Sequence, residues 1–119
     1  MITLVPATQP LEPAALTDRL ARLGPGWTVQ EQDGIPRLGK TYRVADFRQA
    51  MALAVLLGEL AESVDHHPVL TVSWGRLGVQ WWTHVLHGLH ENDFTMAAAS
   101  DSVAEEFMQN SGADRTTQS

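Results

Sequence analysis

The stretch VLTVSWGRLGVQWWTHV, residues 69–85, decides the fold, because it predicts two strands joined by a tight turn. Val69–Trp74 and Leu77–Val85 largely alternate apolar and polar side chains, which is typical of half-buried strands. Gly75-Arg76 between them fits a two-residue hairpin turn with glycine at its first position. Side chains alternate across a sheet, so one face is apolar throughout and is expected to face the core: Leu70, Val72, Trp74, Leu77, Val79 and Trp81.

The other face of this hairpin is polar and is predicted to bring histidines together. The register that pairs Val72 with Val79 continues to place His67 opposite His84, and opposed Cβ atoms lie about 4.5–5.5 Å apart. His66 is adjacent to His67 in the chain. The sequence therefore predicts a trio of histidines on the non-core face. The residues expected on this face are Thr71, Ser73, Gly78, Gln80, Trp82 and His84.

The residues before this hairpin predict a helix followed by another hairpin. Leucines at helical spacing indicate a helix over about Pro10–Leu23, and Gly24-Pro25 is a strong stop signal. Strands are expected over about Trp27–Glu31 and Arg37–Val44. The dipeptide Asp33-Gly34 favours a hairpin turn between them, because both central residues of that turn need positive φ.

Two further helices flank the central hairpin. Asp46 begins the first of them in a capping-box pattern with Gln49, and Pro68 lies past its end. The second is expected from about Glu91 to Gln109. The predicted core stripe of the first consists of Phe47, Ala50, Met51, Ala54, Leu57 and Ala61. That of the second consists of Phe94, Ala97, Ala98, Ala104, Phe107 and Met108.

These elements predict an α+β fold with the order α-β-β-α-β-β-α. Hairpins separated by helices favour a four-stranded antiparallel sheet with helices packed on one face. We expect one domain over residues 1–109, which is long enough to bury its own core. Residues 110–119 are polar and lack apolar anchors, so we expect a flexible tail there.

The composition excludes several classes of protein. There is no cysteine, which excludes a disulfide framework, cysteine-ligated metals and thiol catalysis. The net charge of −6 disfavours nucleic-acid binding. The longest apolar run, near Met51–Leu57, is far shorter than the about 20 residues of a membrane span. Met1–Pro10 has no lysine, arginine or long apolar stretch, so we expect no secretory signal, no membrane association and a cytoplasmic location.

Other interpretations of the same residues stay open. A histidine in a strand is usually a polar surface residue, Asp93 can simply interact with the dipole of its helix, and Glu62 is in a position that is usually solvated. Trp82 fits either interface packing or a wall against a flat ring. His84, His87 and His90 form a short series that keeps a histidine–carboxylate metal site in view, although Gly88 interrupts it. We expect no metal.

At these residues the sequence resembles the pterin-4a-carbinolamine dehydratase family. The matching stretch is Glu62-Ser-Val-Asp-His66-His67-Pro68, followed by Trp74, His84 and Asp93 at the spacing of the family signature. The resemblance extends from about Trp27 to Phe107, and the full pattern is much more specific than a His-His-Pro alone. Three positions depart from the usual family residues, namely Val85 after the third histidine, Leu70 after the proline and His90 before the last helix.

The resemblance implies a hydro-lyase that dehydrates 4a-hydroxytetrahydropterin to quinonoid dihydropterin. This reaction recycles the cofactor after aromatic amino-acid hydroxylation, and it needs neither a cofactor nor a metal. His66 and His67 are then acid–base and pterin-orienting groups, and His84 is the acid at the hydroxyl. Glu62 and Asp93 are expected to fix a histidine tautomer or position a turn. The residues expected to bind or support the pterin are Glu62, Pro68, Trp74, Trp82 and Asp93.

The family also suggests partners and an alternative function. The resemblance implies a homodimer or homotetramer and a functional link to an aromatic amino-acid hydroxylase. Relatives of this fold include a RuBisCO assembly factor and a dimerisation cofactor of a homeodomain transcription factor. A non-catalytic binding or assembly protein is therefore the alternative, although such a protein has no use for the complete trio of histidines.

Overall fold

Every predicted helix and strand is present, in the predicted order. The computed structural model describes residues 2–118, with side chains up to residue 110. One element is additional, a short 3-10 helix after the last strand. The elements are α1 (Pro13–Arg22), β1 (Thr28–Gln32), β2 (Ile35–Arg43), α2 (Phe47–Val64), β3 (Val69–Ser73), β4 (Arg76–Trp81), η1 (His84–Leu86) and α3 (Glu91–Gln118). The flexible tail expected over residues 110–119 lies almost wholly outside the described side chains and stays a prediction.

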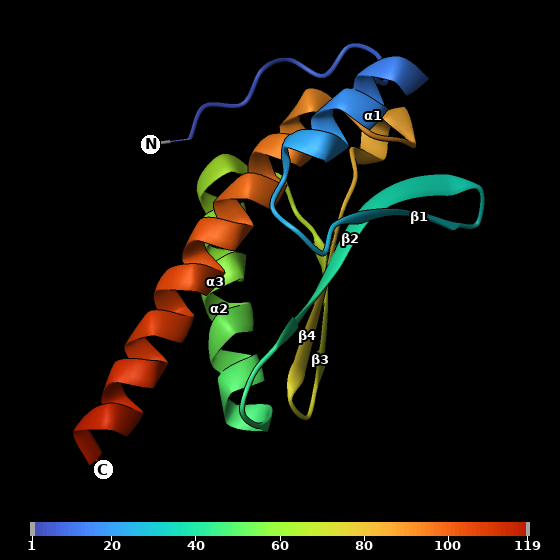
Figure 1. Ribbon diagram of the computed structural model, residues 1–119. Helices are drawn as coiled ribbons and strands as arrows, with labels where there is room; N and C mark the ends of the chain where they lie inside the picture. The colour runs from blue at the N-terminus through green and yellow to red at the C-terminus, as the bar shows by residue number, and fades with distance from the viewer. Residues whose placement is uncertain (1, 119) are drawn as a thin grey trace.

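The four strands form one antiparallel sheet in the order β1-β2-β4-β3. Helices α2 and α3 run side by side on one face of this sheet, and the other face carries no helix (Figure 1). The α+β prediction, with helices on one face, is therefore confirmed. Within the described residues, no helix is long and apolar enough to cross a membrane.

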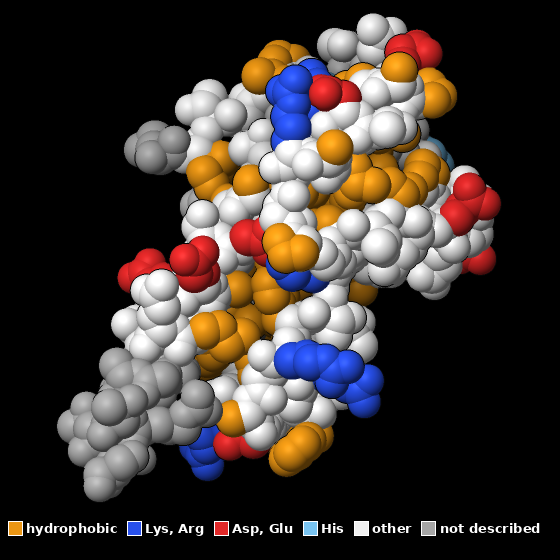
Figure 2. All heavy atoms as spheres, in the orientation of Figure 1, with side chains coloured by type: hydrophobic (Ala, Val, Ile, Leu, Met, Phe, Trp, Pro, Cys, Tyr) orange, Lys and Arg blue, Asp and Glu red, His pale blue; other side chains and the backbone are white. Residues whose placement is uncertain are grey.

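The core lies between the sheet and the two long helices. Leu77, Val79 and Trp81 of β4 are fully buried, as predicted for the core face of the hairpin. Leu53 and Leu57 of α2 meet them and are fully buried too. Hydrophobic side chains also reach the surface between α3 and the sheet (Figure 2).

The register of the central hairpin differs from the predicted one. Val72 pairs with Leu77, not with Val79, and the two turn residues are Trp74 and Gly75. Gly75 has a φ of 75°, so glycine occupies the second turn position, where a positive φ is required, instead of the first. Trp74 is consequently 71% exposed in the turn and is not a core residue. Each paired residue of β3 has a partner two positions earlier in β4 than predicted. Since side chains alternate with a period of two, the paired residues keep their predicted faces of the sheet.

Helix α2 begins as predicted, and three of its six predicted core residues, Ala50, Leu57 and Ala61, are buried. Gln49 N–H donates to the Asp46 carboxylate at 2.9 Å, and the Gln49 side chain accepts from Ala45 N–H. Phe47 and Met51 were expected in the core, yet they are 48% and 47% exposed. Leu53 is buried in their place, so the stripe that meets the sheet is rotated away from Phe47 and Met51. The buried residues of this stripe are Ala50, Leu53, Leu57 and Ala61.

A carboxylate of α3 ties this helix to the sheet. Asp101 accepts hydrogen bonds from Trp27 Nε1 at 2.9 Å, Lys40 Nζ at 2.8 Å and Tyr42 OH at 2.7 Å. Burial, together with the neighbouring Asp101 carboxylate, raises the pKa of the Tyr42 hydroxyl, so the hydroxyl remains a donor. No local sequence pattern indicated this cluster.

Replacing Asp101 with alanine should lower the free energy of unfolding by about 2–3 kcal/mol, because three partly buried donors lose their acceptor. Urea denaturation of the two proteins measures this difference. Asp18→Ala is the matched control, since Asp18 pairs with Arg19 and Arg22 on the surface of α1 and should cost under about 1 kcal/mol. Equal losses for both variants would contradict a role for Asp101 in stability.

Candidate functional site

Three histidines line one hollow at the end of the sheet where β3 begins and β4 ends. The hollow has a volume of about 330 Å³. Its histidines come from the segment after α2 and from the start of η1. The residues around it are Ala7, Asp65, His66, His67, Thr83, His84 and Val85.

The histidines meet by a route other than the predicted cross-strand pairing. Strand β4 ends at Trp81, and His84 opens η1, so His84 does not lie opposite His67 in a ladder. An isolated bridge between Thr83 and Gly88 closes the loop that carries His84. The predicted register was wrong, yet both chain segments leave the same end of adjacent strands, which brings the side chains around one hollow.

The end of α2 sets the direction of the first two histidines. Asp65 has a left-handed conformation, with φ 53°, and caps the helix. His66 N–H donates to the carbonyl of Ala61 at 3.2 Å, which completes the cap. Pro68 follows His67 and directs the chain into β3, because the residue before a proline favours an extended conformation.

His66 is held by a fully buried carboxylate. Its Nε2–H donates to Asp93 Oδ1 at 2.7 Å, and its ring stacks on Trp81 with 5.6 Å between centroids. The other oxygen of Asp93 accepts from Thr83 Oγ1 and from His90 N–H, both at 2.9 Å. Since a carboxylate accepts the Nε2 proton, the neutral ring keeps Nδ1 free as an acceptor.

His67 is paired with Glu62 in a more exposed position. Its Nε2–H donates to Glu62 Oε2, and half of the His67 side chain is exposed. Glu62 projects from the last turns of α2, five residues earlier. Glu62 therefore orients His67 as Asp93 orients His66, but without burial.

His84 has no hydrogen-bond partner for its ring among the described residues. It stacks on Trp82, with 4.5 Å between ring centroids and 7° between planes. Trp82 is itself buried, and the guanidinium of Arg37 lies 3.9 Å from its ring centroid. Both nitrogens of the exposed His84 ring are thus available to exchange a proton with a ligand or with water.

The structure does not bring Trp74 to this hollow within the chain. Trp74 lies in the turn at the far end of β3 and β4, six positions after Pro68, or roughly 20 Å along an extended strand. Pro68 adjoins the hollow through the chain but does not line it. Glu62 and Asp93 hold His67 and His66, and Trp82 supports His84.

Two contributors were not anticipated from the sequence. His90 begins α3, where its Nδ1 accepts from Asn92 N–H at 3.1 Å, so a histidine replaces the usual capping Ser or Thr. The side chain of Asn92 pairs with both backbone groups of Val5, at 2.9 and 2.7 Å. This pairing holds the N-terminal segment so that Ala7 forms one wall of the hollow. The spacing from His90 to Asp93 was a capping-box signal, whereas nothing indicated the contact to Val5.

The histidine series at 84, 87 and 90 does not form a metal site. His87 follows η1 in a left-handed conformation, and His90 is buried at the start of α3. Among the residues that the structure describes, no group of three or more histidine or carboxylate side chains is placed to hold a metal ion.

Comparison with known proteins identifies the family. The model of the family described as "Pterin 4 alpha carbinolamine dehydratase" matches residues 9–103. A protein of Chlorobium luteolum named "Putative pterin-4-alpha-carbinolamine dehydratase" is 48% identical over 90 residues, which cover 76% of this chain and 79% of that one. A Gloeobacter violaceus protein of the same name, numbered 1, is 50% identical over 80 residues, or 67% of this chain and 69% of its own.

Two solved structures are similar to this chain in fold. A transcriptional coactivator/pterin dehydratase from Brucella melitensis has a TM-score of 0.70 at 28% identity, covering 80% of this chain and 98% of that one. A pterin dehydratase-like protein identified as a RuBisCO assembly factor in the alpha-carboxysome has a TM-score of 0.56 at 22% identity, covering 66% and 89%. This second likeness concerns the fold alone. With its family model matched over most of its length, the chain belongs to the pterin-4-alpha-carbinolamine dehydratase family.

Proposed function

We propose that this protein dehydrates a 4a-hydroxytetrahydropterin to the quinonoid dihydropterin by histidine acid–base catalysis. The observation that carries this proposal is the meeting of His66, His67 and His84 around one hollow, in a chain of this family. The reaction would serve the recycling of a tetrahydropterin cofactor after aromatic amino-acid hydroxylation.

The chemistry suits three imidazoles. The bond between C4a and its hydroxyl oxygen breaks, and the hydroxyl leaves as water after receiving a proton. N5 loses a proton, and its electron pair forms the double bond to C4a, so no electrons are exchanged with a partner. An imidazole titrates near neutral pH, which lets one histidine donate and another accept.

The surroundings of each histidine support distinct roles. His84 is the acid at the leaving hydroxyl, because its ring is exposed and makes no side-chain hydrogen bond to the described residues. His66, with its Nε2–H held by Asp93, offers Nδ1 as an acceptor and orients the pterin. His67, held by Glu62, shares the acid–base and orienting work. Trp82 supports the ring of His84 from behind.

Purified protein should accelerate the loss of the 4a-hydroxy adduct formed by an aromatic amino-acid hydroxylase, with or without EDTA. Absorbance measurements of the adduct with time give the rate against buffer alone. A rate equal to that in buffer would remove the enzyme proposal. Strong inhibition by EDTA would revive a metal site at the histidines.

A non-catalytic binding protein is the second candidate, and one observation favours it. The outer side of α2 exposes Phe47, Met51, Val55 and Leu56, an apolar surface available for another protein. The dehydratase assay separates the two candidates, because a binding protein has no need to accelerate dehydration.

The same apolar surface supports assembly with further copies of this chain. We propose a dimer whose sheets join at their edges, paired again into a tetramer through α2. A further hollow of about 480 Å³ lies between α2 and α3, beside the exposed stripe. Its apolar lining is Leu56, Leu60, Val103 and Phe107, and its polar lining is Glu59, Glu106 and Asn110. A second copy of the chain would remove the exposed stripe and this hollow from water. Burial of apolar surface stabilises association by about 25 cal/mol per Å².

Light scattering at micromolar concentration should give a mass of two or four chains. Val55→Lys places a charge on the exposed stripe and should reduce the tetramer to a smaller species that is still folded, as judged by circular dichroism. Ala21→Lys, on the exposed side of α1, is the control and should leave the mass unchanged. A parent mass of only 13.1 kDa would contradict the proposed assembly.

A further inference from the structure

The face of the sheet opposite the helices is polar and carries no carboxylate. By the strand registers, its side chains alternate away from the core-facing leucines, valine and tryptophan of β2 and β4. The chain as a whole has a net charge of −6, so a carboxylate-free face with three arginines is unusual for it. The residues on this face are Thr28, Gln30, Gln32, Ile35, Arg37, Gly39, Thr41, Arg43, Val69, Thr71, Ser73, Arg76, Gly78 and Gln80.

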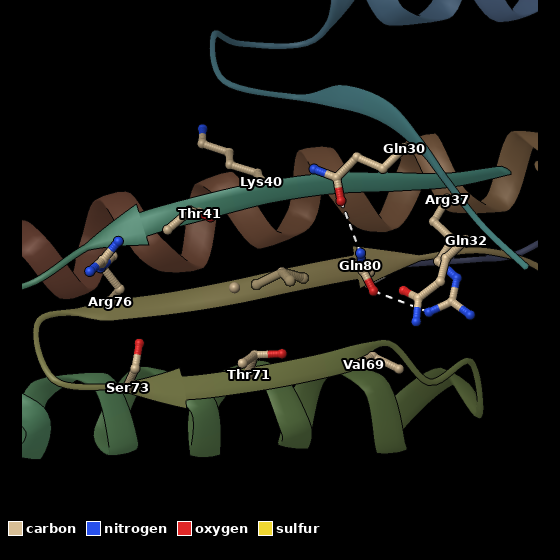
Figure 3. Close-up of a pocket in the computed structure, with 12 residues that line it drawn as sticks. Gln30, Gln32, Arg37, Lys40, Thr41, Val69, Thr71, Ser73, Arg76 and Gln80 are labelled. Carbon is tan, nitrogen blue, oxygen red and sulfur yellow. Dashed lines mark hydrogen bonds between the residues drawn. The ribbon is translucent and has the colours of Figure 1, made fainter.

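A hollow of about 490 Å³ lies on this face (Figure 3). This volume falls within the roughly 300–1,000 Å³ that is typical of small-molecule sites. Gly78 lies in the middle strand of the hollow, between Thr41 of β2 and Thr71 of β3. A Cβ at Gly78 would meet Thr71 Cβ at 3.5 Å, which is ordinary contact, so the glycine is not needed for packing and leaves the floor open.

Arg76 lines one end of the hollow, and a second arginine, Arg43, lies next to it on β2, outside the residues that line the hollow. Arg43 and Arg76 are directly opposed on β2 and β4, and Ser73 is opposed to Arg76 on β3. Like charges at directly opposed positions destabilise a sheet. Neither arginine makes an ion pair with any side chain that the structure describes. This row of two guanidinium groups and a hydroxyl is therefore suited to an anion with several oxygens.

The other cations near the hollow are already engaged. Arg37, at the far end in Figure 3, donates to Gln80 Oε1 at 3.2 Å and lies over the ring of Trp82. Lys40 belongs to the core-facing side of β2 and is paired with Asp101 at 2.8 Å. Arg37 has no carboxylate partner among the described side chains either, but its guanidinium is engaged by Gln80 and Trp82. The guanidinium groups of Arg43 and Arg76 make no ion pair with the described side chains and stay open to a ligand.

We propose that this face is a second binding site, for a small phosphate monoester with a hydroxyl-rich body. The phosphate binds Arg43, Arg76 and Ser73, and the body lies over Gly78 between the hydroxyls of Thr41 and Thr71. Guanidinium groups recognise phosphate oxygens in pairs. The face has no aromatic side chain on which nucleic-acid bases could stack, which disfavours a single-stranded nucleic acid as the ligand.

Calorimetric titration of the full chain with glucose 6-phosphate, glucose and inorganic phosphate tests this site. Glucose 6-phosphate should bind with saturation, inorganic phosphate more weakly, and glucose not measurably. The double variant Arg43→Gln, Arg76→Gln should weaken glucose 6-phosphate binding at least tenfold. Arg48→Gln is the matched control and should leave binding unchanged, because Arg48 is an exposed arginine of α2 away from this face.

Gly78→Val tests the hollow itself. Valine fills the floor of the hollow and is favoured in strands, so the melting temperature should not fall. The affinity for glucose 6-phosphate should fall at least fivefold, and the affinity for inorganic phosphate should be unchanged. Binding that survives the double arginine variant, or that Arg48→Gln weakens equally, would overturn the site. Equal affinity of the parent protein for glucose 6-phosphate and inorganic phosphate would overturn the proposal that the hollow binds the body of the ligand. Saturable binding of a polyglutamate peptide but not of the sugar phosphate would replace the proposed ligand with an acidic polypeptide.

Discussion

Replacement of His84 by alanine should lower the dehydration rate at least about 100-fold, the usual contribution of a positioned acid or base. The protein should still fold, because the His84 ring is exposed and makes no hydrogen bond to the described side chains. Loss of the stacking on Trp82 should cost no more than about 1 kcal/mol in the free energy of unfolding. Steady-state kinetics and urea denaturation of the variant measure the two effects.

The control for this experiment is His87→Asn. His87 is exposed three residues later and has a φ of 52°, which asparagine tolerates better than alanine does. It should change neither the rate nor the stability. A His84→Ala variant that retains its rate would transfer the acid role to His66 or His67, and one that unfolds would make His84 a structural residue.

Replacement of Asp93 by alanine should lower the free energy of unfolding by about 3 kcal/mol or more. The Asp93 side chain is fully buried and accepts from Thr83, His66 and the backbone of His90, so its removal leaves three buried donors without an acceptor. The start of α3 also loses the reciprocal bond of its cap, from His90 N–H to Asp93, while the bond from Asn92 N–H to His90 Nδ1 remains. Urea denaturation measures the loss. Glu62→Ala removes the exposed partner of His67 and should cost under about 1 kcal/mol.

Asp93→Asn separates the positioning of His66 from folding. Asparagine keeps the shape of the aspartate side chain but lacks the negative charge that accepts the Nε2–H of His66. Nitrogen chemical shifts of the His66 ring should therefore report a change of tautomer, together with a lower kcat in the folded population. An unchanged tautomer with unchanged kcat would restrict Asp93 to a role in stability.

The sequence predicted the faces of the central hairpin but not its register. Gly75 could occupy either central position of a two-residue turn, and each choice gives a regular hairpin. The two choices differ by two positions in pairing, so alternation assigns the same residues to the core in both. Trp74 moves from a strand into the turn, and Arg76 moves from the turn into β4. Hydrophobic periodicity cannot distinguish registers that differ by an even number.

The same limit applies to α2, which is apolar on two sides. Ala50, Leu57 and Ala61 are buried as predicted, but Leu53 on one side and Phe47 and Met51 on the other both fit beside them at helical spacing. The sheet selects Leu53. Phe47 and Met51 are left exposed, on the surface that we propose binds further copies of the chain.

The sequence indicated that the three histidines, Glu62 and Asp93 lie close together, but it wrongly added Trp74 and did not indicate the contacts that hold these residues in place. The spacing of the histidines, with Glu62 and Asp93, indicated the residues that the structure gathers at one end of the sheet. The links from Asp93 to Thr83 and from Asn92 to Val5 join residues far apart in sequence, or depend on where β4 ends. Contacts of this kind produce no periodic pattern in the amino-acid sequence, so they cannot be predicted from it.

The wall contributed by Ala7 has a practical meaning for protein production. An affinity tag or fusion partner placed ahead of residue 2 is joined directly to the segment that Asn92 clamps beside the histidines. Its bulk would pull on that segment, and preparations tagged at this end should differ in KM from untagged protein. A tag on the opposite end follows α3, whose 28 residues extend roughly 42 Å from the site. Purification handles therefore belong after α3.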